Sequence, residues 1–381
     1  MFFFVIFSLL LFFSVSCSSP PEAPAPEEEP AAAEGSPEET QTPAGSEAAE
    51  AGETEDPDGE TPAEAPETEA AEETGELTPE LLELKPNELG EIMILMYHEI
   101  GEPESEWRRT PDNFRRDLQT LYDQGYRAIS MTDLVRGEID LPAGTSPVVL
   151  TFDDGNRGNF NYLEKDGELV LDPDCAVAIL EAFYEKHPDF GLEATFYIYY
   201  PNPFRQPEYL QEKLDYLVER GFEIGNHTYS HGNLARLSDE DVQKELALHV
   251  KTTQEYLPGY TVNSLALTYG AYPQNPGLAV QGSYQGTSYY HEAILLVGAN
   301  PAPSPFHQGF DPTRLPRIRA SEMKTDGVGL YEWLEVLENN PRRRYISDGN
   351  PRTITAPESL KDRLDEARAG ERTVRFYEEQ D

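Results

Sequence analysis

The chain has 381 residues, of which 71 are acidic and 29 are lysine or arginine, so its formal net charge is −42. No stretch resembles a basic patch. This argues against a nucleic-acid partner and against charge-driven binding to acidic lipids or acidic polymers. The two cysteines are Cys17 and Cys175. If Cys17 is lipidated or removed, no intrachain disulfide is possible, which a chain with a large core tolerates.

The N-terminus begins with an apolar run that is short for a hydrocarbon core of ~30 Å. Small residues follow the run, and Cys17 comes after Val15 and Ser16, as at a bacterial lipoprotein cleavage site. Two features depart from that pattern: no Lys or Arg precedes the run, and Ser14 stands where Leu is usual. We predict a signal peptide over residues 1–17 and a lipid anchor on Cys17, which would hold a secreted protein on the outer face of the cell membrane. An ordinary secretory signal and a retained anchor helix are the alternatives.

Residues 18–88 are rich in Glu, Ala, Pro and Thr and contain almost no aliphatic or aromatic side chain before Leu77. Residues 18–90 hold 23 acids against one base, Lys85, which is a net charge of −22 and about half of the total. Such a segment cannot bury enough apolar surface to offset the entropy that it would lose on ordering. We predict a disordered, self-repelling linker over residues 18–88.

From residue 89 onward, short apolar runs alternate with longer amphipathic stretches. The apolar runs predict strands, in chain order, at 92–97, 128–130, 148–152, 194–198, 222–225, 265–267, 293–297 and 315–319. The amphipathic stretches predict helices at 114–124, 176–186, 207–220 and after Ser238, a good N-cap. We assign residues 89–355 to one folded domain and residues 356–381 to a helical, polar tail.

The order of these elements indicates the fold class. Continuous apolar strands that alternate with helices are typical of parallel β/α units. With about seven strands, closure into a barrel is favoured over an open sheet. In such barrels, catalytic residues follow the C-terminal ends of the strands. The sequence therefore predicts an α/β fold with a barrel-like sheet.

Two adjacent carboxylates, Asp153 and Asp154, follow the predicted strand at 148–152 and precede Gly155. Carboxylates at the end of an apolar strand are costly to desolvate, and they are tolerable where a cation or a proton transfer uses them. This favours a functional pair. A solvent-exposed Asp-Asp-Gly turn is the alternative.

Two histidines, His227 and His231, follow another short strand. On a helical turn, side chains at positions i and i+4 point the same way, so that they can chelate one metal ion. Two unrelated surface histidines are the alternative. The combination is more specific than either part, because the aspartate pair follows one predicted strand and the histidine pair follows another, two strands further on.

With these motifs, the sequence resembles the polysaccharide deacetylases with a NodB-homology domain, carbohydrate esterase family 4, over roughly residues 90–320. Thr151–Gly155 matches that family's first motif, and His227–His231 matches its second, a His-Ser/Thr-x-x-His pattern. Leu267–Tyr272 resembles the third motif, although the Arg and Pro common there are missing. Met96–Ile100 is similar to members that act on extracellular polysaccharide. The resemblance implies a distorted (β/α)7 barrel of the NodB-homology type.

The resemblance also implies a metal-dependent hydrolase that removes N-acetyl groups from amino sugars of a cell-wall or extracellular polysaccharide. Asp154, His227 and His231 would hold a divalent metal ion, with zinc preferred, and would leave positions open for water and substrate. Asp153 would be the general base that takes a proton from the attacking water. The metal and a backbone N–H near Tyr269 would stabilise the oxyanion.

The general acid is not supplied by these motifs. Many members of that family place a histidine in a Leu-x-His motif on a late strand, but the predicted strand at 293–297 contains none. We predict that His98 takes the role, because it ends the first strand and should face the catalytic mouth; a core histidine is the alternative. His307, on a proline-rich loop, is the second candidate. His187 and His249 fall in helices and are expected at the surface.

Three stretches between the predicted elements are candidates for the rim of a binding site. Residues 156–190 are long for a strand-to-helix connection and begin with polar and aromatic side chains. Residues 201–205 and the Gly/Tyr/Ser-rich stretch 282–290 are the others. Some of the tyrosines at 284–290 are candidates for stacking on sugar rings.

Two other functions stay open. An O-acetyl carbohydrate esterase could use the same metal site. A catalytically silent carbohydrate-binding protein is favoured by the altered third motif and the missing late histidine, and it is opposed by the intact aspartate and histidine pairs. The expected partners are an acetylated polysaccharide and, through Cys17, the membrane.

Overall fold

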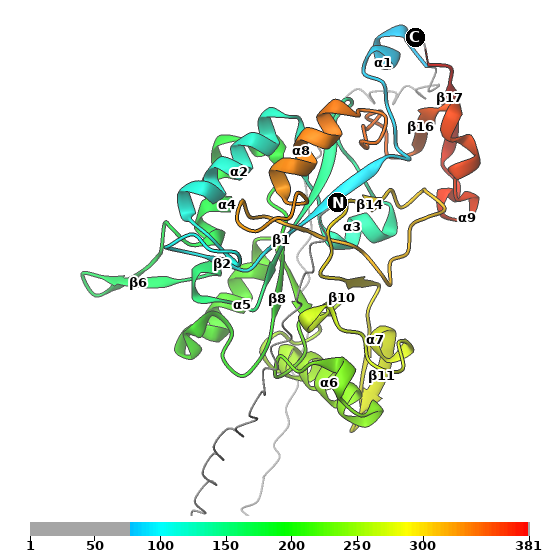
Figure 1. Ribbon diagram of the computed structural model, residues 1–381. Helices are drawn as coiled ribbons and strands as arrows, with labels where there is room; N and C mark the ends of the chain where they lie inside the picture. The colour runs from blue at the N-terminus through cyan, green and yellow to red at the C-terminus, as the bar shows by residue number, and fades with distance from the viewer. Residues whose placement is uncertain (1–76, 380–381) are drawn as a thin grey trace, which may run out of the picture. The chain divides into compact units, whose positions relative to one another are not determined.

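The structure is a computed structural model that describes residues 77–379 (Figure 1). The signal peptide predicted over residues 1–17 and most of the linker predicted over residues 18–88 lie outside the described residues, so the lipid anchor on Cys17 stays a prediction. Within residues 77–379, no helix is both long and apolar enough to span a membrane.

The central sheet has nine strands: seven parallel strands form a ring, β4 (Tyr126–Ala128) adds to β5 in parallel, and β14 (Ala302–Pro303) adds to β1 in the antiparallel direction. Each strand of the ring overlaps an apolar run that was predicted as a strand. Every residue of β5 is buried, as expected for a parallel strand that is covered on both faces. The seven strands are β1 (Glu91–Tyr97), β5 (Ser146–Asp153), β8 (Thr195–Ile198), β9 (Glu223–Asn226), β10 (Ser264–Ala266), β13 (Ala293–Leu295) and β15 (Ile318–Arg319).

The pairing of these strands closes the sheet on itself. Parallel pairs run from β1 through β5, β8, β9 and β10 to β13. β15 pairs in parallel with β1, and Leu315, just before β15, bridges in parallel to Leu295 of β13. The segment 315–319 thus joins the two ends of the sheet. A single residue pair, Leu265 with Asn226, joins β10 to β9, so the ring is irregular. The predicted distorted barrel of β/α units is confirmed.

Helices cover the outside of this ring, and side chains cap the N-termini of α2, α3 and α6. Thr110, Ser130 and Ser238 each accept a hydrogen bond from the backbone N–H three residues on, at 2.9–3.2 Å. In Figure 1, α2, α4 and α8 lie on one flank of the sheet, while α6 and α7 lie on another. The helices are α1 (Pro79–Glu83), α2 (Pro111–Asp123), α3 (Met131–Arg136), α4 (Ala176–Lys186), α5 (Leu210–Glu219), α6 (Asp239–Tyr256), α7 (Gly277–Val280), α8 (Leu330–Asn339) and α9 (Glu366–Ala369).

Shorter elements decorate the barrel, and two of them are antiparallel hairpins in stretches predicted as rim. The hairpins are β6–β7 (Tyr162–Lys165 and Glu168–Leu171) and β11–β12 (Gln281–Tyr284 and Thr287–Tyr290). The other short strands are β2 (Glu99–Ile100), β3 (Arg108–Arg109), β4 (Tyr126–Ala128) and β14 (Ala302–Pro303). The 3-10 helices are η1 (Arg157–Asn159), η2 (Pro188–Phe190), η3 (Pro203–Arg205), η4 (Pro207–Tyr209), η5 (Leu234–Arg236), η6 (Thr268–Gly270) and η7 (Glu358–Arg363).

The C-terminal segment folds into a small unit of its own. β16 (Thr353–Pro357) pairs in parallel with β17 (Thr373–Tyr377), and η7 and α9 lie between them. The domain boundary expected at residue 355 therefore falls inside β16, and residues 356–381, expected to be a helical and polar tail, contain a strand as well as a helix. The strands in this segment could not be predicted from its composition, because the apolar residues that β16 packs against, Leu89 and Phe306, lie far away in the sequence.

Glu88 is buried where this unit meets the barrel. Its carboxylate accepts hydrogen bonds from the backbone N–H of Thr355 at 2.8 Å and from the hydroxyl of Tyr345 at 3.1 Å. Burial, and next the charge of Asp348, raise the pKa of Glu88 from 4.5 to about 8. Because the folded pKa lies above the unfolded one, folding takes up a proton in this window, so stability falls as pH rises from about 4.5 to about 8.

We expect Glu88→Gln to remove this pH dependence. Each pH unit between the two pKa values changes the free energy of unfolding by at most about 1.4 kcal/mol. The free energy of unfolding of wild type minus that of Glu88→Gln should fall between pH 5 and pH 8 and level off above that range. Urea unfolding at several pH values measures this difference. Glu83→Gln, at an exposed position of α1, is the control. A difference between wild type and Glu88→Gln that does not vary with pH would contradict the raised pKa.

Candidate active site

The first aspartate of the pair ends β5 and is bound by a buried arginine. Asp153 is 1% exposed, and Arg317 is 0% exposed. The two guanidinium NH2 groups donate to the two carboxylate oxygens at 2.7 Å each. The remaining donors of Arg317 reach the hydroxyl of Thr151 at 3.1 Å and the carbonyl of Leu296 at 2.9 Å. This is the bidentate geometry that makes arginine–carboxylate pairs strong and directional.

Arg317 is the site residue that the sequence analysis did not single out. It belongs to the run 315–319, which was predicted as a strand without a role for its charges. A signal was present, because an arginine inside a strand that must be buried needs an anionic partner. The partner, Asp153, is 164 residues away in the chain. Only the closure of the barrel brings the two together.

The second aspartate turns away from the strand. Asp154 has a φ of 72°, a left-handed conformation that is uncommon outside glycine. Its side chain therefore leaves the line of β5 and points to the histidine pair. Its Oδ1 atom lies 3.4 Å from Nε2 of His227 and 3.2 Å from Nε2 of His231. The structure thus brings Asp154, His227 and His231 together, as expected.

The two histidines lie on an irregular loop and not on the helical turn that was expected. The loop is held by its own side chains: Oδ1 of Asn226 accepts from the N–H of Thr228 at 2.9 Å, and Oγ1 of Thr228 accepts from the N–H of Gly232 at 3.0 Å. Thr228 and His231 both have a φ of 60°. Such local bonds compete with helix formation, and they bend the chain so that both imidazoles face Asp154.

These three side chains fit a divalent metal ion. Zinc bonds of ~2.0–2.1 Å place tetrahedral ligand atoms ~3.3 Å apart, which matches the two Asp154–histidine distances. The Nδ1 atom of His227 lies 2.8 Å from the carbonyl of Ala266 and must donate to it. In the neutral imidazole, Nε2 is then an unprotonated acceptor that faces a carboxylate oxygen. The lone pair of His227 Nε2 and the carboxylate oxygen of Asp154 repel each other, and a cation or a proton between the two atoms removes this repulsion. The hydrogen bond from Nδ1–H to a carbonyl is also the usual support of a histidine that binds metal through Nε2.

Electrostatics keeps both aspartates ionised. Burial alone would raise the pKa of Asp153, but the charge and hydrogen bonds of Arg317 outweigh burial, so this pKa lies below its ordinary value. Burial likewise opposes ionisation of Asp154, while the close contacts with His227 and His231 hold its pKa well below its ordinary value. A bound cation would act on Asp154 in the same direction.

His98 lies beside the aspartate pair, as expected from its place after β1. Its Nε2 atom is 4.0 Å from Oδ2 of Asp153, and its ring packs on the indole of Trp107 with centroids 4.7 Å apart. Burial lowers the pKa of His98, and the charges of Asp153 and Asp154 only partly restore it. Near neutral pH, the imidazole is therefore mainly neutral.

Tyr269 and the rim stretch at 201–205 complete the surroundings of the histidine pair. The hydroxyl of Tyr269 lies 3.2 Å from Nδ1 of His231, and Tyr269 itself has a φ of 58°. The ring centroid of Tyr199 lies 5.0 Å from that of His231. Arg205 donates to the hydroxyl of Tyr199 at 2.7 Å. His231 thus has two tyrosine rings next to it.

The other histidines lie elsewhere. His307 forms a bridge with Leu364, in the C-terminal segment, so the structure does not place it in this site. His249 was expected at the surface, and this was wrong: it is fully buried, with Nε2 at 2.9 Å from the carbonyl of Ile198. Burial lowers its pKa to about 3, so it is a neutral core histidine.

Comparisons with known proteins agree with the motifs. Residues 141–282 match the family model described as polysaccharide deacetylase. The Bacillus subtilis (strain 168) protein YxkH, named as a polysaccharide deacetylase, is 24% identical over 168 residues, which are 43% of this chain and 52% of that protein. A peptidoglycan-N-acetylglucosamine deacetylase of Bacillus cereus is 27% identical over 136 residues, which are 35% of this chain and 40% of that protein.

Among solved structures, the Streptococcus pyogenes deacetylase PplD in complex with acetate aligns with a TM-score of 0.45 and 20% identity, covering 64% of this chain and 97% of that one. This chain spans about half of the length of the first curated relative and less of the second. The family resemblance drawn from the motifs is confirmed by the match over residues 141–282. The matched residues 141–282 include the aspartate pair and both histidines of the candidate site.

Proposed function

We propose that this chain, whose residues 141–282 match the polysaccharide deacetylase family model, is a metal-dependent hydrolase that removes N-acetyl groups from amino sugars of a polysaccharide. The observation that carries the proposal is the convergence of Asp154, His227 and His231 beside Asp153 at the C-terminal ends of β5 and β9. In barrels of this kind, that end of the strands carries the chemistry. The two named curated relatives are a polysaccharide deacetylase and a peptidoglycan deacetylase, which supports the same reaction class.

The three ligand residues would leave part of the metal's coordination sphere for water and the acetyl group. When bound, the ion would polarise the acetamide carbonyl and lower the pKa of the attacking water. Asp153 would accept the proton of that water. Arg317 orients the Asp153 carboxylate and keeps it ionised, so that it is ready to act as a base.

His98 would return the proton to the leaving amine. Because the pKa of His98 is lowered, the imidazole is neutral at rest and must first receive a proton. Asp153 is the donor at hand, since its Oδ2 atom lies 4.0 Å from Nε2 of His98 and a small shift would bring the two within hydrogen-bonding distance. The path then runs from water to Asp153, to His98 and to the sugar nitrogen, and acetate leaves. In the same proposal, the backbone near Tyr269 faces the developing oxyanion.

An O-acetyl esterase is the competing function, and product analysis separates the two. N-deacetylation releases one free amine for each acetate, whereas O-deacetylation releases acetate and no amine. We expect acetate and amine in equal amounts from chitohexaose and no acetate from O-acetylated xylan. Acetate from the xylan alone would favour the esterase. No acetate from either substrate, together with binding of sugar, would favour a silent carbohydrate-binding protein.

The metal centre predicts the metal content of the purified chain. We expect about one divalent ion per chain, zinc for preference, and loss of most of it in His227→Ala, because a two-ligand site binds metal weakly. His231→Gln, at a more exposed position, should lose metal without the cavity that the first change creates. His307→Ala is the matched control, since His307 lies outside the site. Elemental analysis measures the content, and full metal in both site variants would overturn the ligand assignment.

A further inference from the structure

The ring of His98 is not fixed by a hydrogen bond. In His227, by contrast, the bond between Nδ1 and the carbonyl of Ala266 sets the orientation of the ring. Among the described residues, no group forms such a bond with the imidazole of His98, whose Nε2 atom lies 4.0 Å from Oδ2 of Asp153. A group that moves a proton must stay within reach of both the donor and the acceptor. Packing must therefore hold this ring.

The indole of Trp107 supplies that packing. The centroids of the two rings lie 4.7 Å apart, and their planes are inclined at 56°. The side chain of His98 is only 17% exposed, although it follows the strand end that opens to the catalytic mouth. Trp107 itself is 42% exposed, so it lies between the imidazole and solvent. The indole thus limits the positions that the imidazole can take.

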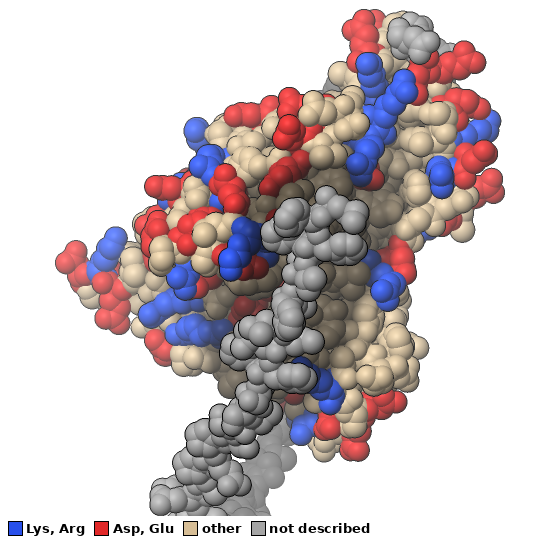
Figure 2. Space-filling model, viewed as in Figure 1, with Lys and Arg blue, Asp and Glu red and all other residues tan. Residues whose placement is uncertain are grey.

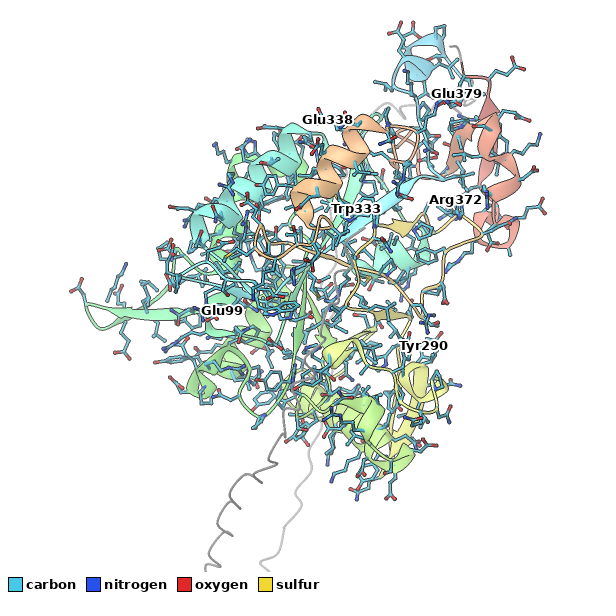
Figure 3. The ribbon with its side chains drawn as sticks, in the orientation of Figure 1. Glu99, Tyr290, Trp333, Glu338, Arg372 and Glu379 are labelled. Atoms are coloured by element: carbon cyan, nitrogen blue, oxygen red, sulfur yellow. The ribbon has the colours of Figure 1, made fainter. Side chains whose placement is uncertain are left out.

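A short parallel ladder brings the two side chains together. β2 begins directly after His98 and pairs with β3, which begins directly after Trp107. The N–H of Glu99 donates to the carbonyl of Trp107 at 3.2 Å, and the side chains of Glu99 and Arg108 form an ion pair at 2.7 Å. Figure 3 shows Glu99 at the end of β1 that lies away from the C-terminal unit. The loop that leaves at His98 therefore returns at Trp107.

An arginine of β15 holds the indole in place. The guanidinium carbon of Arg319 lies 5.0 Å from the centroid of the Trp107 ring, within the range of a cation–π interaction. The same guanidinium donates to the carboxylate of Glu106 at 2.8 Å and to the carbonyl of Lys324. Because Glu106 directly precedes Trp107, Arg319 binds both the indole and its neighbour in the chain.

The place of Arg319 in the barrel distinguishes it from other surface cations. Figure 2 shows acidic and basic side chains mixed over the flank of α2 and α4 and over the C-terminal unit, so charged neighbours are common on this protein. Arg319, however, follows Arg317 by two residues, and residues two apart on a strand face the same side. Arg317 binds Asp153, and Arg319 binds the residue that packs on His98. The segment thus supports both groups that move protons in the proposed mechanism.

We propose that Trp107, itself held by Arg319, is a positioning residue for His98. The indole keeps the imidazole where it can take the proton from Asp153 and pass it to the departing amine. This role rests on the proposed deacetylase function and concerns its proton-transfer step. Without the indole, the imidazole samples orientations that cannot complete the transfer, so that kcat falls more than KM rises.

The need for an acid depends on the leaving group, which provides a selective test. An amine leaves only after it is protonated, whereas 4-nitrophenolate leaves without a proton. Both chitohexaose and 4-nitrophenyl acetate require the attacking water and Asp153. A residue that acts through His98 should therefore matter for chitohexaose and not for the ester. Damage to the whole site would lower both rates.

The measurement uses the full-length, zinc-loaded protein. We expect Trp107→Ala to lower kcat for chitohexaose about tenfold to a hundredfold and to change its KM less than about threefold. The value of kcat/KM for 4-nitrophenyl acetate should change less than about twofold. Trp107→Phe should recover most of the loss, because a phenyl ring can pack on the imidazole. Arg319→Met should lower kcat for chitohexaose by about twofold to fivefold, since it releases the indole without removing it.

Trp333 offers a matched control outside the site. It is the other of the two tryptophans in the chain, and the guanidinium carbon of Arg343 lies 5.2 Å from its ring centroid. Arg343 in turn pairs with Glu91 at 2.9 Å, so the arrangement repeats that of Trp107. Figure 3 shows Trp333 well apart from Glu99. Trp333→Ala should affect the two substrates alike.

A double-mutant cycle decides whether Trp107 acts through His98. In a His98→Gln background, Trp107→Ala should change kcat for chitohexaose less than about twofold. Equal losses in both backgrounds, equal losses on both substrates, or a rise in KM without a loss of kcat would overturn the positioning role alone. Full activity of His98→Gln would overturn the acid role of His98 together with that of Trp107. No acetate from wild type on any acetylated glycan would overturn the deacetylase function and this role with it.

Discussion

Asp153→Asn is expected to lower the rate of acetate release by about 10²–10⁴ while the protein keeps its metal. The amide has nearly the shape of the carboxylate, but it cannot accept the proton of the attacking water. The metal should remain because Asp153 points to Arg317 and not to the histidines. Metal content, the folded fraction from circular dichroism and acetate release are measured on one preparation, since Arg317 loses its anionic partner in this variant.

Asp154→Asn is the paired variant with the opposite pattern. Its carboxylate faces His227 and His231, so the change should weaken metal binding and reduce activity as a consequence. Excess zinc should restore part of the activity here and none in Asp153→Asn. If Asp153→Asn lost the metal and Asp154→Asn kept it, the two roles would have to be exchanged.

Arg317→Met should destabilise the fold by about 3–5 kcal/mol, because it leaves the carboxylate of Asp153 buried without a partner. The loss should be smaller at low pH. Without Arg317, burial raises the pKa of Asp153, so the carboxyl group takes up a proton in the folded state as pH falls and the unpaired charge disappears. Activity at neutral pH should fall as well, since Arg317 no longer orients the Asp153 carboxylate. Urea unfolding at several pH values measures the stability.

A neighbouring arginine serves as the control for that result. Arg319 also lies on β15, but its partner Glu106 is at the surface, so Arg319→Met should cost about 0–1 kcal/mol. The double variant Arg317→Met/Asp153→Leu removes both buried charges, and it should be more stable than Arg317→Met alone. Equal losses of unfolding free energy in Arg317→Met and Arg319→Met would show that the buried Arg317–Asp153 pair contributes no more to stability than a surface ion pair.

The strands of the barrel were predictable because they are buried on both faces. Most of them therefore appear in the sequence as short apolar runs, and the residues that follow each run mark the catalytic end of the sheet. That is why Asp153, Asp154, His98 and the histidine pair could be placed near one another before the structure was known. The prediction depended on where strands end, and it needed no knowledge of side-chain geometry.

Features set by contacts distant in sequence could not be predicted in this way. Arg317 finds its partner only when the sheet closes. The bend between His227 and His231 depends on side-chain bonds of Asn226 and Thr228, which a helical spacing argument ignores. His249 was misplaced for the same reason, since the carbonyl that it binds belongs to another element.

Acetate release by the metal-free and the metal-restored protein tests whether a bound metal ion is required for deacetylation. The full-length chain is stripped with a chelator until elemental analysis finds no divalent metal, and acetate release from chitohexaose is measured before and after zinc is added back. We expect no acetate from the stripped wild type, recovery with about one equivalent of zinc, and no recovery in His227→Ala. Undiminished acetate release by the metal-free protein, or no acetate from the zinc-loaded protein on any acetylated substrate, would contradict a metal-dependent deacetylase.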